Sequence, residues 1–199
     1  MKNIFCTAAM IGIWSVSVFA QQREKLDSIN AKRLDINKKG MFVLGGWAAV
    51  NIATGTPLAI VTPESPDKYF HEMNAVWNTV NLGLAISGLL SDKKEKGKVY
   101  SLYETMNESN KAQKILLFNA GLDAGYIATG LFLRQWGFNN DQYQNRLIGY
   151  GNSLLIQGGF LMAFDFTMFA LHSTNNPKIK ELFSYVRPTP TGLAFCYTF

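Results

Sequence analysis

Residues 40–62, GMFVLGGWAAVNIATGTPLAIVT, decide the fold because no charged side chain occurs in this stretch. A helix needs about 20 apolar residues to cross the hydrocarbon core of a bilayer. The turn-forming segment PESPD at residues 63–67 ends the stretch. It therefore predicts a first membrane-spanning helix at 40–62.

Three further stretches have the same character. Residues 73–90 carry no charge. Residues 115–133 contain Asp123 as their single charge, and residues 147–171 contain Asp165. Lipid cannot hydrogen-bond an exposed backbone, so spans of this kind are expected to be helical. We therefore expect an all-α fold, a four-helix transmembrane bundle with spans at 40–62, 73–90, 115–133 and 147–171.

The composition agrees with a membrane protein. Charged residues make up 17% of the 199 residues, against roughly 25% in soluble domains. The mean hydropathy of +0.02 averages uncharged spans with charged connectors. Nucleic acid is a poor candidate partner, because the 19 Lys and Arg residues lie in connectors rather than along one helix. The expected partners are the lipid bilayer and a second copy of the chain or another subunit of an envelope complex.

The N-terminus has the features of a secretory signal peptide. A basic start at residues 1–3 precedes an apolar run at 4–18, and Val18 and Ala20 place small residues where a signal peptidase reads. We expect residues 1–20 to be removed and the protein to be exported to the bacterial cell envelope. The alternative is an uncleaved anchor helix, and the membrane orientation stays open because the basic connectors conflict with the positive-inside rule.

The segments that flank the bundle are polar. Residues 21–39 place Leu26, Ile29, Leu34 and Ile36 among charges, which predicts an amphipathic interfacial helix. Residues 173–199 are expected to form a polar tail with a short terminal strand.

Part of the chain resembles another part of it. When residues 39–55 are aligned with residues 114–130, seven of seventeen positions are identical, including IATG at 52–55. This similarity favours duplication of a helical hairpin, with chance similarity between apolar helices as the alternative.

Each predicted span carries a polar stripe at helical spacing. His71, Asn74, Asn78 and Asn81 follow one face of the second span. Because lipid cannot satisfy polar side chains, we expect the stripes to turn inward. The resulting interior candidates are Asn51, His71, Asn74, Asn78, Asn81, Asn119, Asp123, Tyr126, Gln157 and Asp165.

Two interpretations of these residues stay open. They are either hydrogen bonds that hold the helices together or the lining of a polar cavity for a small solute. Asp123 and Asp165 carry the second interpretation, because a carboxyl inside a membrane is costly. Gly121 and Gly125 flank Asp123 in a pattern typical of close helix packing.

An enzyme is the alternative function, using an intramembrane Asp with His71 or His172. No short metal-ligand spacing, phosphate-binding loop or nucleophile motif occurs, so we expect no metal and no cofactor.

Three phrases carry a family resemblance: NKKGMFVLGGWAAVNIATG (37–55), KYFHEMNAVWNTVNLGLAISG (68–88) and LIGYGNSLLIQGGFLMAFDFTMFALH (147–172). Together they resemble an uncharacterised family of small exported multipass proteins from Bacteroidota, classed as a domain of unknown function. The resemblance implies a signal peptide and a four-helix membrane bundle, and it implies no activity, cofactor or catalytic residue.

Overall fold

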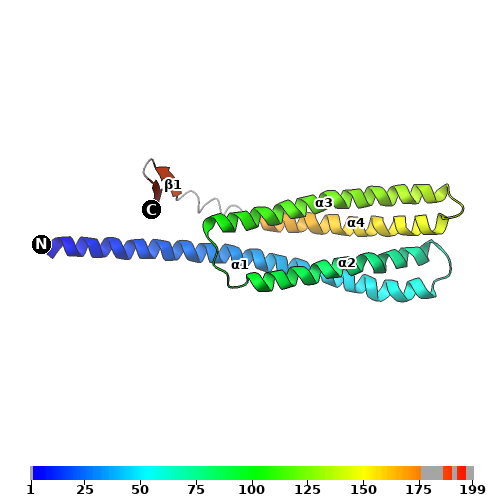
Figure 1. Ribbon diagram of the computed structural model, residues 1–199, viewed down its shortest axis with the longest axis horizontal. Coiled ribbons are helices and arrows are strands. Elements are labelled where there is room, and N and C mark those ends of the chain that lie inside the picture. The colour runs from blue at the N-terminus through cyan, green and yellow to red at the C-terminus, as the bar shows by residue number, and fades with distance from the viewer. Residues whose placement is uncertain (1, 176–185, 190–191, 196–199) are drawn as a thin grey trace.

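The computed structural model describes residues 2–175, 186–189 and 192–195, and it describes side chains for residues 21–175. Four helices build the fold: α1 Lys2–Val61, α2 Pro66–Glu95, α3 Leu102–Phe138 and α4 Gln144–Ser173. Two short antiparallel strands follow, β1 Val186–Thr189 and β2 Gly192–Phe195 (Figure 1). The predicted all-helical character of the bundle is confirmed, and β2 lies in the tail where a short strand is expected.

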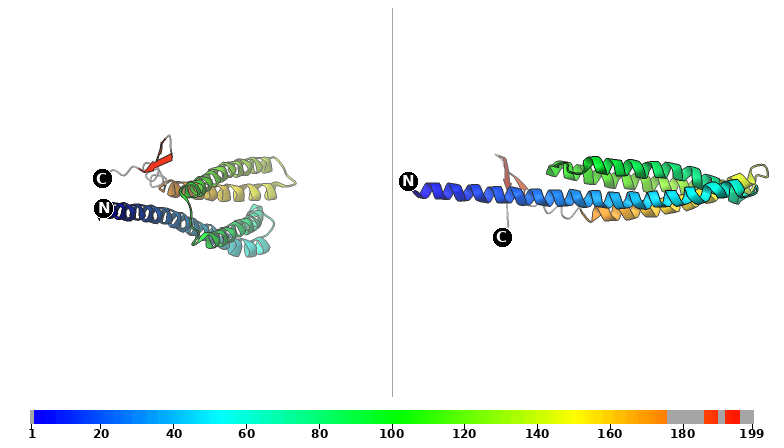
Figure 2. Two further views of the ribbon diagram at one scale, coloured as in Figure 1. Left: turned by 60° about the vertical axis from the view of Figure 1, so that its left-hand side comes forward. Right: turned by 90° about the horizontal axis from the view of Figure 1, so that it is seen from below.

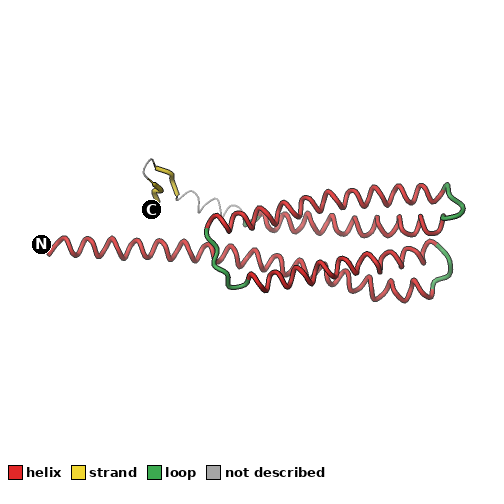
Figure 3. Tube along the Cα trace, in the orientation of Figure 1, coloured by secondary structure: helices red, strands yellow, loops and turns green. Residues whose placement is uncertain are grey.

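The helices form two antiparallel hairpins, α1 with α2 and α3 with α4 (Figures 1 and 2). The loops at 62–65 and 139–143 lie at one end, and the loop at 96–101 lies at the other (Figure 3). Helix α4 packs on α2 as well as on α3, and thereby joins the hairpins. Helix α2 packs more extensively on α1 and α4 than on α3, which leaves the α2–α3 side of the bundle the more open one.

Glycines allow α4 to approach both of these neighbours closely. A Cβ atom at Gly151 would lie 2.7 Å from the carbonyl oxygen of Gly130 on α3. On the other side, a Cβ atom at Gly149 would lie 2.9 Å from the backbone nitrogen of Phe70 on α2. A real Cβ does not tolerate such distances, so α4 can occupy the centre of the bundle only with glycine at these positions.

The predicted packing role of Gly121 and Gly125 is wrong for contacts within this chain. No atom lies within 4 Å of a Cβ built at either position. Two residues along a helix correspond to a rotation of about 200°. Because Asp123 faces the interior, its neighbours at plus and minus two face outward. Gly130 makes the close contact instead.

Residues 21–39 are helical, as predicted, but they are not separate from the first helix of the bundle, and their interfacial position stays a prediction. They continue α1 without a break through Gly40 (Figure 1). Leu26 and Ile29 pack against Leu102 and Met106 at the start of α3. The buried positions of α1 recur at intervals of three or four residues across the charge boundary; they include Leu26, Ile29, Arg33, Ile36, Gly40, Leu44 and Ala48. We call residues 21–39, 91–114 and 172–175 the polar end of the bundle.

Within the described residues, three helices are long and apolar enough to cross a membrane: Gln21–Val61, Leu102–Phe138 and Gln144–Ser173. Large apolar side chains cover their outer surfaces, and Phe42, Phe118 and Phe132 are each more than half exposed. Helix α2 does not reach the same hydropathy because three asparagines lie in its apolar stretch, and the fourth span therefore stays a prediction. Helix α3 has 37 residues and is about 55 Å long, which exceeds a hydrocarbon core of about 30 Å.

Gly55 and Gly130, which the internal alignment pairs, occupy comparable places in the two hairpins. A Cβ at Gly55 would lie 2.9 Å from the carbonyl oxygen of His71 on α2, and one at Gly130 would lie 2.8 Å from that of Gly151 on α4. Each glycine thus brings the two helices of its own hairpin together. The duplication and the cleavage of residues 1–20 stay predictions.

Candidate binding site

A hydrogen-bonded network lies at the centre of the bundle. The Gln157 side chain is fully buried and contacts two other helices. Its Oε1 accepts a 2.9 Å hydrogen bond from Trp47 Nε1 on α1, and its Nε2 donates a 2.9 Å bond to Asn74 Oδ1 on α2. Ser153 Oγ on α4 donates to the same Asn74 oxygen at 2.7 Å. The network therefore fixes α1, α2 and α4 relative to one another.

The remaining interior asparagines extend this network along α2. Asn78 Nδ2 donates to the carbonyl oxygen of Asn74 at 2.8 Å, and Asn81 Nδ2 donates to Asn78 Oδ1 at 3.3 Å. Half-buried Asn51 accepts a long 3.4 Å bond from Gln157. These amides mainly contact one another, as expected of groups that hold helices together.

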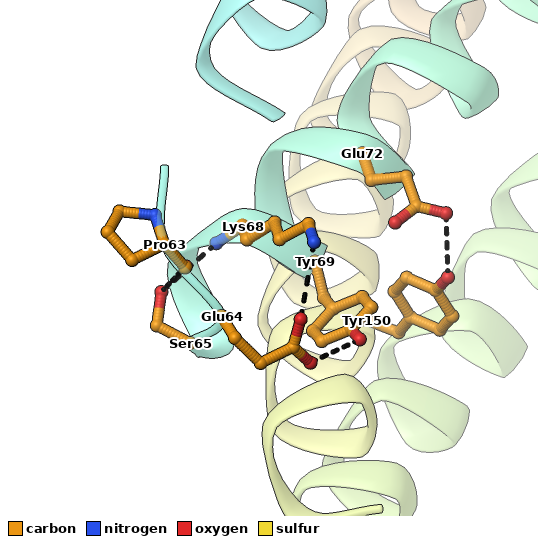
Figure 4. A network of polar contacts seen from close by, with 7 residues as sticks. All are labelled: Pro63, Glu64, Ser65, Lys68, Tyr69, Glu72 and Tyr150. Atoms are coloured by element: carbon orange, nitrogen blue, oxygen red, sulfur yellow. Dashed lines mark hydrogen bonds and ion pairs between the residues drawn. The ribbon is translucent and has the colours of Figure 1, made fainter. Parts of the chain in front are cut away.

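His71 lies apart from this network. Its ring is half-buried and meets Phe70 edge to face at a centroid distance of 5.3 Å. The neighbouring Glu72 accepts a 3.0 Å hydrogen bond from Tyr150, which joins α2 to α4 (Figure 4). This contact belongs to the loop end of the bundle.

The first turn of α2 is fixed by its own polar contacts. Ser65 caps the helix by accepting a bond from the backbone nitrogen of Lys68 (Figure 4). Glu64 accepts hydrogen bonds from the Tyr69 hydroxyl and from Lys68. These two bonds lower the pKa of the Glu64 carboxyl. These contacts at the loop end therefore stabilise the turn that joins α1 to α2.

The two predicted intramembrane carboxyls lie together. Asp123 on α3 and Asp165 on α4 are 3% and 5% exposed, and their carboxyl groups are close enough to share a hydrogen bond. Such a bond requires a proton on one of them, because an ionised carboxylate only accepts hydrogen bonds. Oδ2 of Asp123 accepts no hydrogen bond from a donor group among the described residues. A buried oxygen of this kind calls for a partner such as a ligand or ordered water.

The carboxyl pair lines a cleft of about 580 Å³ between the two hairpins, which all four helices border. Apolar side chains form most of its wall, among them Leu44, Leu84, Leu116, Leu161 and Met168. Of the predicted interior residues, the cleft brings together Asn81, Asn119, Asp123, Tyr126 and Asp165. Asn51, His71, Asn74, Asn78 and Gln157 are not part of its lining.

Aromatic rings lie at the same level of the cleft as the carboxyl pair. Trp77 on α2 and Tyr126 on α3 meet edge to face at a centroid distance of 4.7 Å, and both line the cleft. Tyr126 is one helical turn from Asp123, and Phe164 is adjacent to Asp165. We call these three aromatic residues and the two carboxyls the deep end of the cleft.

The other end of the cleft opens at the polar end of the bundle. Arg33, only 4% exposed, donates a 2.9 Å hydrogen bond to Glu95, and Asn37 donates a 3.3 Å bond to Asp92. Burial raises the pKa of Asp92, and this effect outweighs the lowering by the Asn37 hydrogen bond. Arg33 Nε and Asp92 Oδ2 have no partner among the described residues. The cleft mouth therefore has both a free donor and a free acceptor.

Sequence reasoning missed this mouth. The sequence analysis singled out neither Arg33 nor its partner Glu95, which lies 62 residues away in the chain. The signal that could have found Arg33 is its place in the regular series of buried positions from Leu26 to Ala48.

No group of three His, Cys, Asp or Glu side chains within the described residues is placed to hold a metal ion. Neither His71 nor His172 lines the cleft. His172 is instead buried near Arg33, and its Nε2 lacks a hydrogen-bond partner in the described part of the chain.

Residues 43–166 match the model of a family described as a family of unknown function, DUF6992, and the chain belongs to this family. The matched segment includes the central network and the deep end of the cleft. No curated protein and no solved structure matches the chain.

Proposed function

We propose that this member of the DUF6992 family is an integral membrane protein that binds or passes a small solute through its interior cleft, without catalysing a reaction. One observation carries the proposal. Asp123, 3% exposed, lines a cleft of about 580 Å³, and its buried Oδ2 has no hydrogen-bond donor among the described residues. Carboxyls that served only to hold helices together would be expected to pair fully, as the amides around Gln157 largely do.

Placement in a membrane rests on the apolar outer surface. In water, side chains such as Phe118 and Phe132, exposed by 68% and 64%, would form an unusually large apolar surface. We place α2 in the membrane as a fourth span because it packs on α1 and α4 with its asparagines turned inward. The N-terminal sequence supports export to the cell envelope through a signal peptide.

The enzyme alternative has less support. General acid and base catalysis requires the reacting groups within hydrogen-bond reach of one substrate. His71 lies beside Phe70 and His172 beside Arg33, so neither meets Asp123 and Asp165 in the cleft.

The proposal is tested by purifying the full chain from membranes and measuring, by native mass spectrometry, the masses of the molecules that stay bound to it. Ala112→Trp fills the cleft wall, and Ala163→Trp on the exposed face of α4 is its matched control. We expect the unmodified chain and Ala163→Trp to retain a small non-lipid mass that Ala112→Trp loses. Equal retention by all three chains, or retention only of another protein subunit, would contradict the proposal.

A further inference from the structure

The charges along the cleft favour a cation as its occupant. Two basic residues line it, Arg33 and Lys111, against five acidic ones, Asp92, Glu95, Glu108, Asp123 and Asp165. Arg33 is already neutralised by its 2.9 Å contact with Glu95. The deep end contains the two carboxyls and no basic residue among its lining.

The deep end also has the aromatic surface that suits an organic cation. The faces of Trp and Tyr rings attract cations, and aromatic cages are a common means of binding quaternary ammonium groups. Trp77, Tyr126 and Phe164 line the cleft beside the carboxyl pair. A small hydrated metal ion would gain little from these rings or from the leucines along the wall.

The length and the apolar rim of the cleft favour a cation that carries a large apolar group. Two lining residues of α2, Asn81 and Asp92 at the mouth, are eleven residues apart, or about 16 Å. Exposed Val80, Leu84 and Leu122 form the rim where α2 and α3 separate. An apolar ligand could therefore enter from the lipid phase as well as through the polar mouth.

We infer that the cleft binds a lipophilic organic cation, with the positive group between the Asp123 and Asp165 carboxyls and the Trp77 ring, and the apolar part along the leucine wall. This inference rests on the proposed function and names the class of solute. The Oδ2 of buried Asp123, which lacks a hydrogen-bond donor in the described part of the chain, is the group that the cation would satisfy.

The test uses the full chain in detergent micelles and two probes that share one shape and differ in charge. Binding of radiolabelled tetraphenylphosphonium is measured by equilibrium dialysis, with protein-free micelles subtracted, and tetraphenylborate is measured in the same way. We expect saturable binding of the phosphonium at one site per chain and no saturable binding of the borate. Binding of both probes alike, or of neither, overturns the inference.

Variants then locate the bound cation. Asp165→Asn is expected to weaken phosphonium binding by about tenfold or more, because a buried charged partner is lost. Asp141→Asn, in the exposed loop after α3, is the matched control and should bind as the unmodified chain does. Trp77→Leu should weaken binding by roughly threefold to thirtyfold, whereas Trp136→Leu, on an exposed face outside the cleft, should not.

The two proposals can fail separately. If a retained mass depends on Ala112 but the phosphonium does not bind, the class of solute is wrong and the binding function stands. If no retained mass depends on Ala112 and the phosphonium does not bind, both are wrong. Binding that survives Asp165→Asn unchanged places the cation elsewhere and overturns the inference. The arms with the unmodified chain decide the charge preference even if a variant does not fold.

Discussion

Replacing Gln157 with Leu should destabilise the bundle by about 2 kcal/mol. The Gln157 amide takes part in three hydrogen bonds, with Trp47, Asn74 and Asn51, and is fully buried. Interhelical hydrogen bonds in membranes contribute about 0.6 kcal/mol each, so three of them give about 2 kcal/mol.

A second route gives a similar magnitude. In the Leu variant Asn74 Oδ1 keeps its 2.7 Å bond from Ser153, and the indole N–H of Trp47 is left without its partner. One unsatisfied buried donor costs about 1 to 3 kcal/mol. Leu has nearly the volume of Gln, so loss of packing should contribute little.

The assay is reversible unfolding in mixed micelles, followed by circular dichroism. Gln135→Leu is the matched control, because it makes the same chemical change on an exposed face of α3. Combining Gln157→Leu with Trp47→Phe should cost less than the sum of the two single changes, because both remove the same hydrogen bond. The reasoning is refuted if Gln157→Leu leaves the free energy of unfolding unchanged or raises it relative to Gln135→Leu.

Three further predictions concern packing, the buried ion pair and pH. Gly130→Ala should destabilise the bundle by about 1 to 3 kcal/mol, because its Cβ would lie 2.8 Å from the Gly151 carbonyl oxygen. Gly125→Ala, where no atom lies within 4 Å of the added Cβ, should be neutral or stabilising. Similar losses of stability in both variants would contradict the close packing of α3 on α4 at Gly130. Glu95→Gln should lower the free energy of unfolding by about 1 to 3 kcal/mol, since it removes the charged partner of buried Arg33. Asp35→Asn, which breaks the exposed pair with Lys39, should change the free energy of unfolding by less than about 0.5 kcal/mol. Equal effects of the two changes would argue against burial of Arg33. Because the pKa of Asp92 is raised in the folded state, protonation of Asp92 favours folding at low pH, and this contribution is lost as the pH rises through the raised pKa. Asp92→Asn should therefore have a higher melting temperature than the unmodified chain at pH 7, and the difference should shrink on acidification. A melting temperature of Asp92→Asn below that of the unmodified chain at pH 7 would contradict this prediction.

The sequence predicts the helices well because charge and turn residues mark their limits. The loops after Val61 and Glu95 contain Pro63 and Gly97, and Gly97 has a positive φ of 83°. The continuity of residues 21–39 with the span at 40–62 was missed because the charged residues were interpreted as the end of the buried face. A buried stripe can continue through charged sequence when other helices extend equally far, as the start of α3 does beside Leu26.

The polar interior could be predicted in part for a similar reason. Helical spacing identifies Asn74, Asn78 and Asp123 as inward-facing, and all three are buried. Spacing within one helix cannot tell which stripes meet. That Asp123 meets Asp165, whereas Gln157 meets Trp47 and Asn74, depends on the axial offset between helices, which the glycines of α4 set.

The central claim is that a cleft containing two carboxyls extends inside a bundle whose outer surface faces lipid, and one accessibility measurement tests it most directly. In a chain with Cys6→Ser and Cys196→Ser, single cysteines are placed at Asn119, which lines the cleft, and at the adjacent Phe118, which is 68% exposed on the outer surface. Open membrane fragments, in which both faces are accessible, are then treated with a charged, membrane-impermeant methanethiosulfonate reagent. The account predicts that the cysteine at position 119 reacts and that the one at 118 is protected. Reaction at 118 with protection at 119, or equal reaction at both, would contradict it.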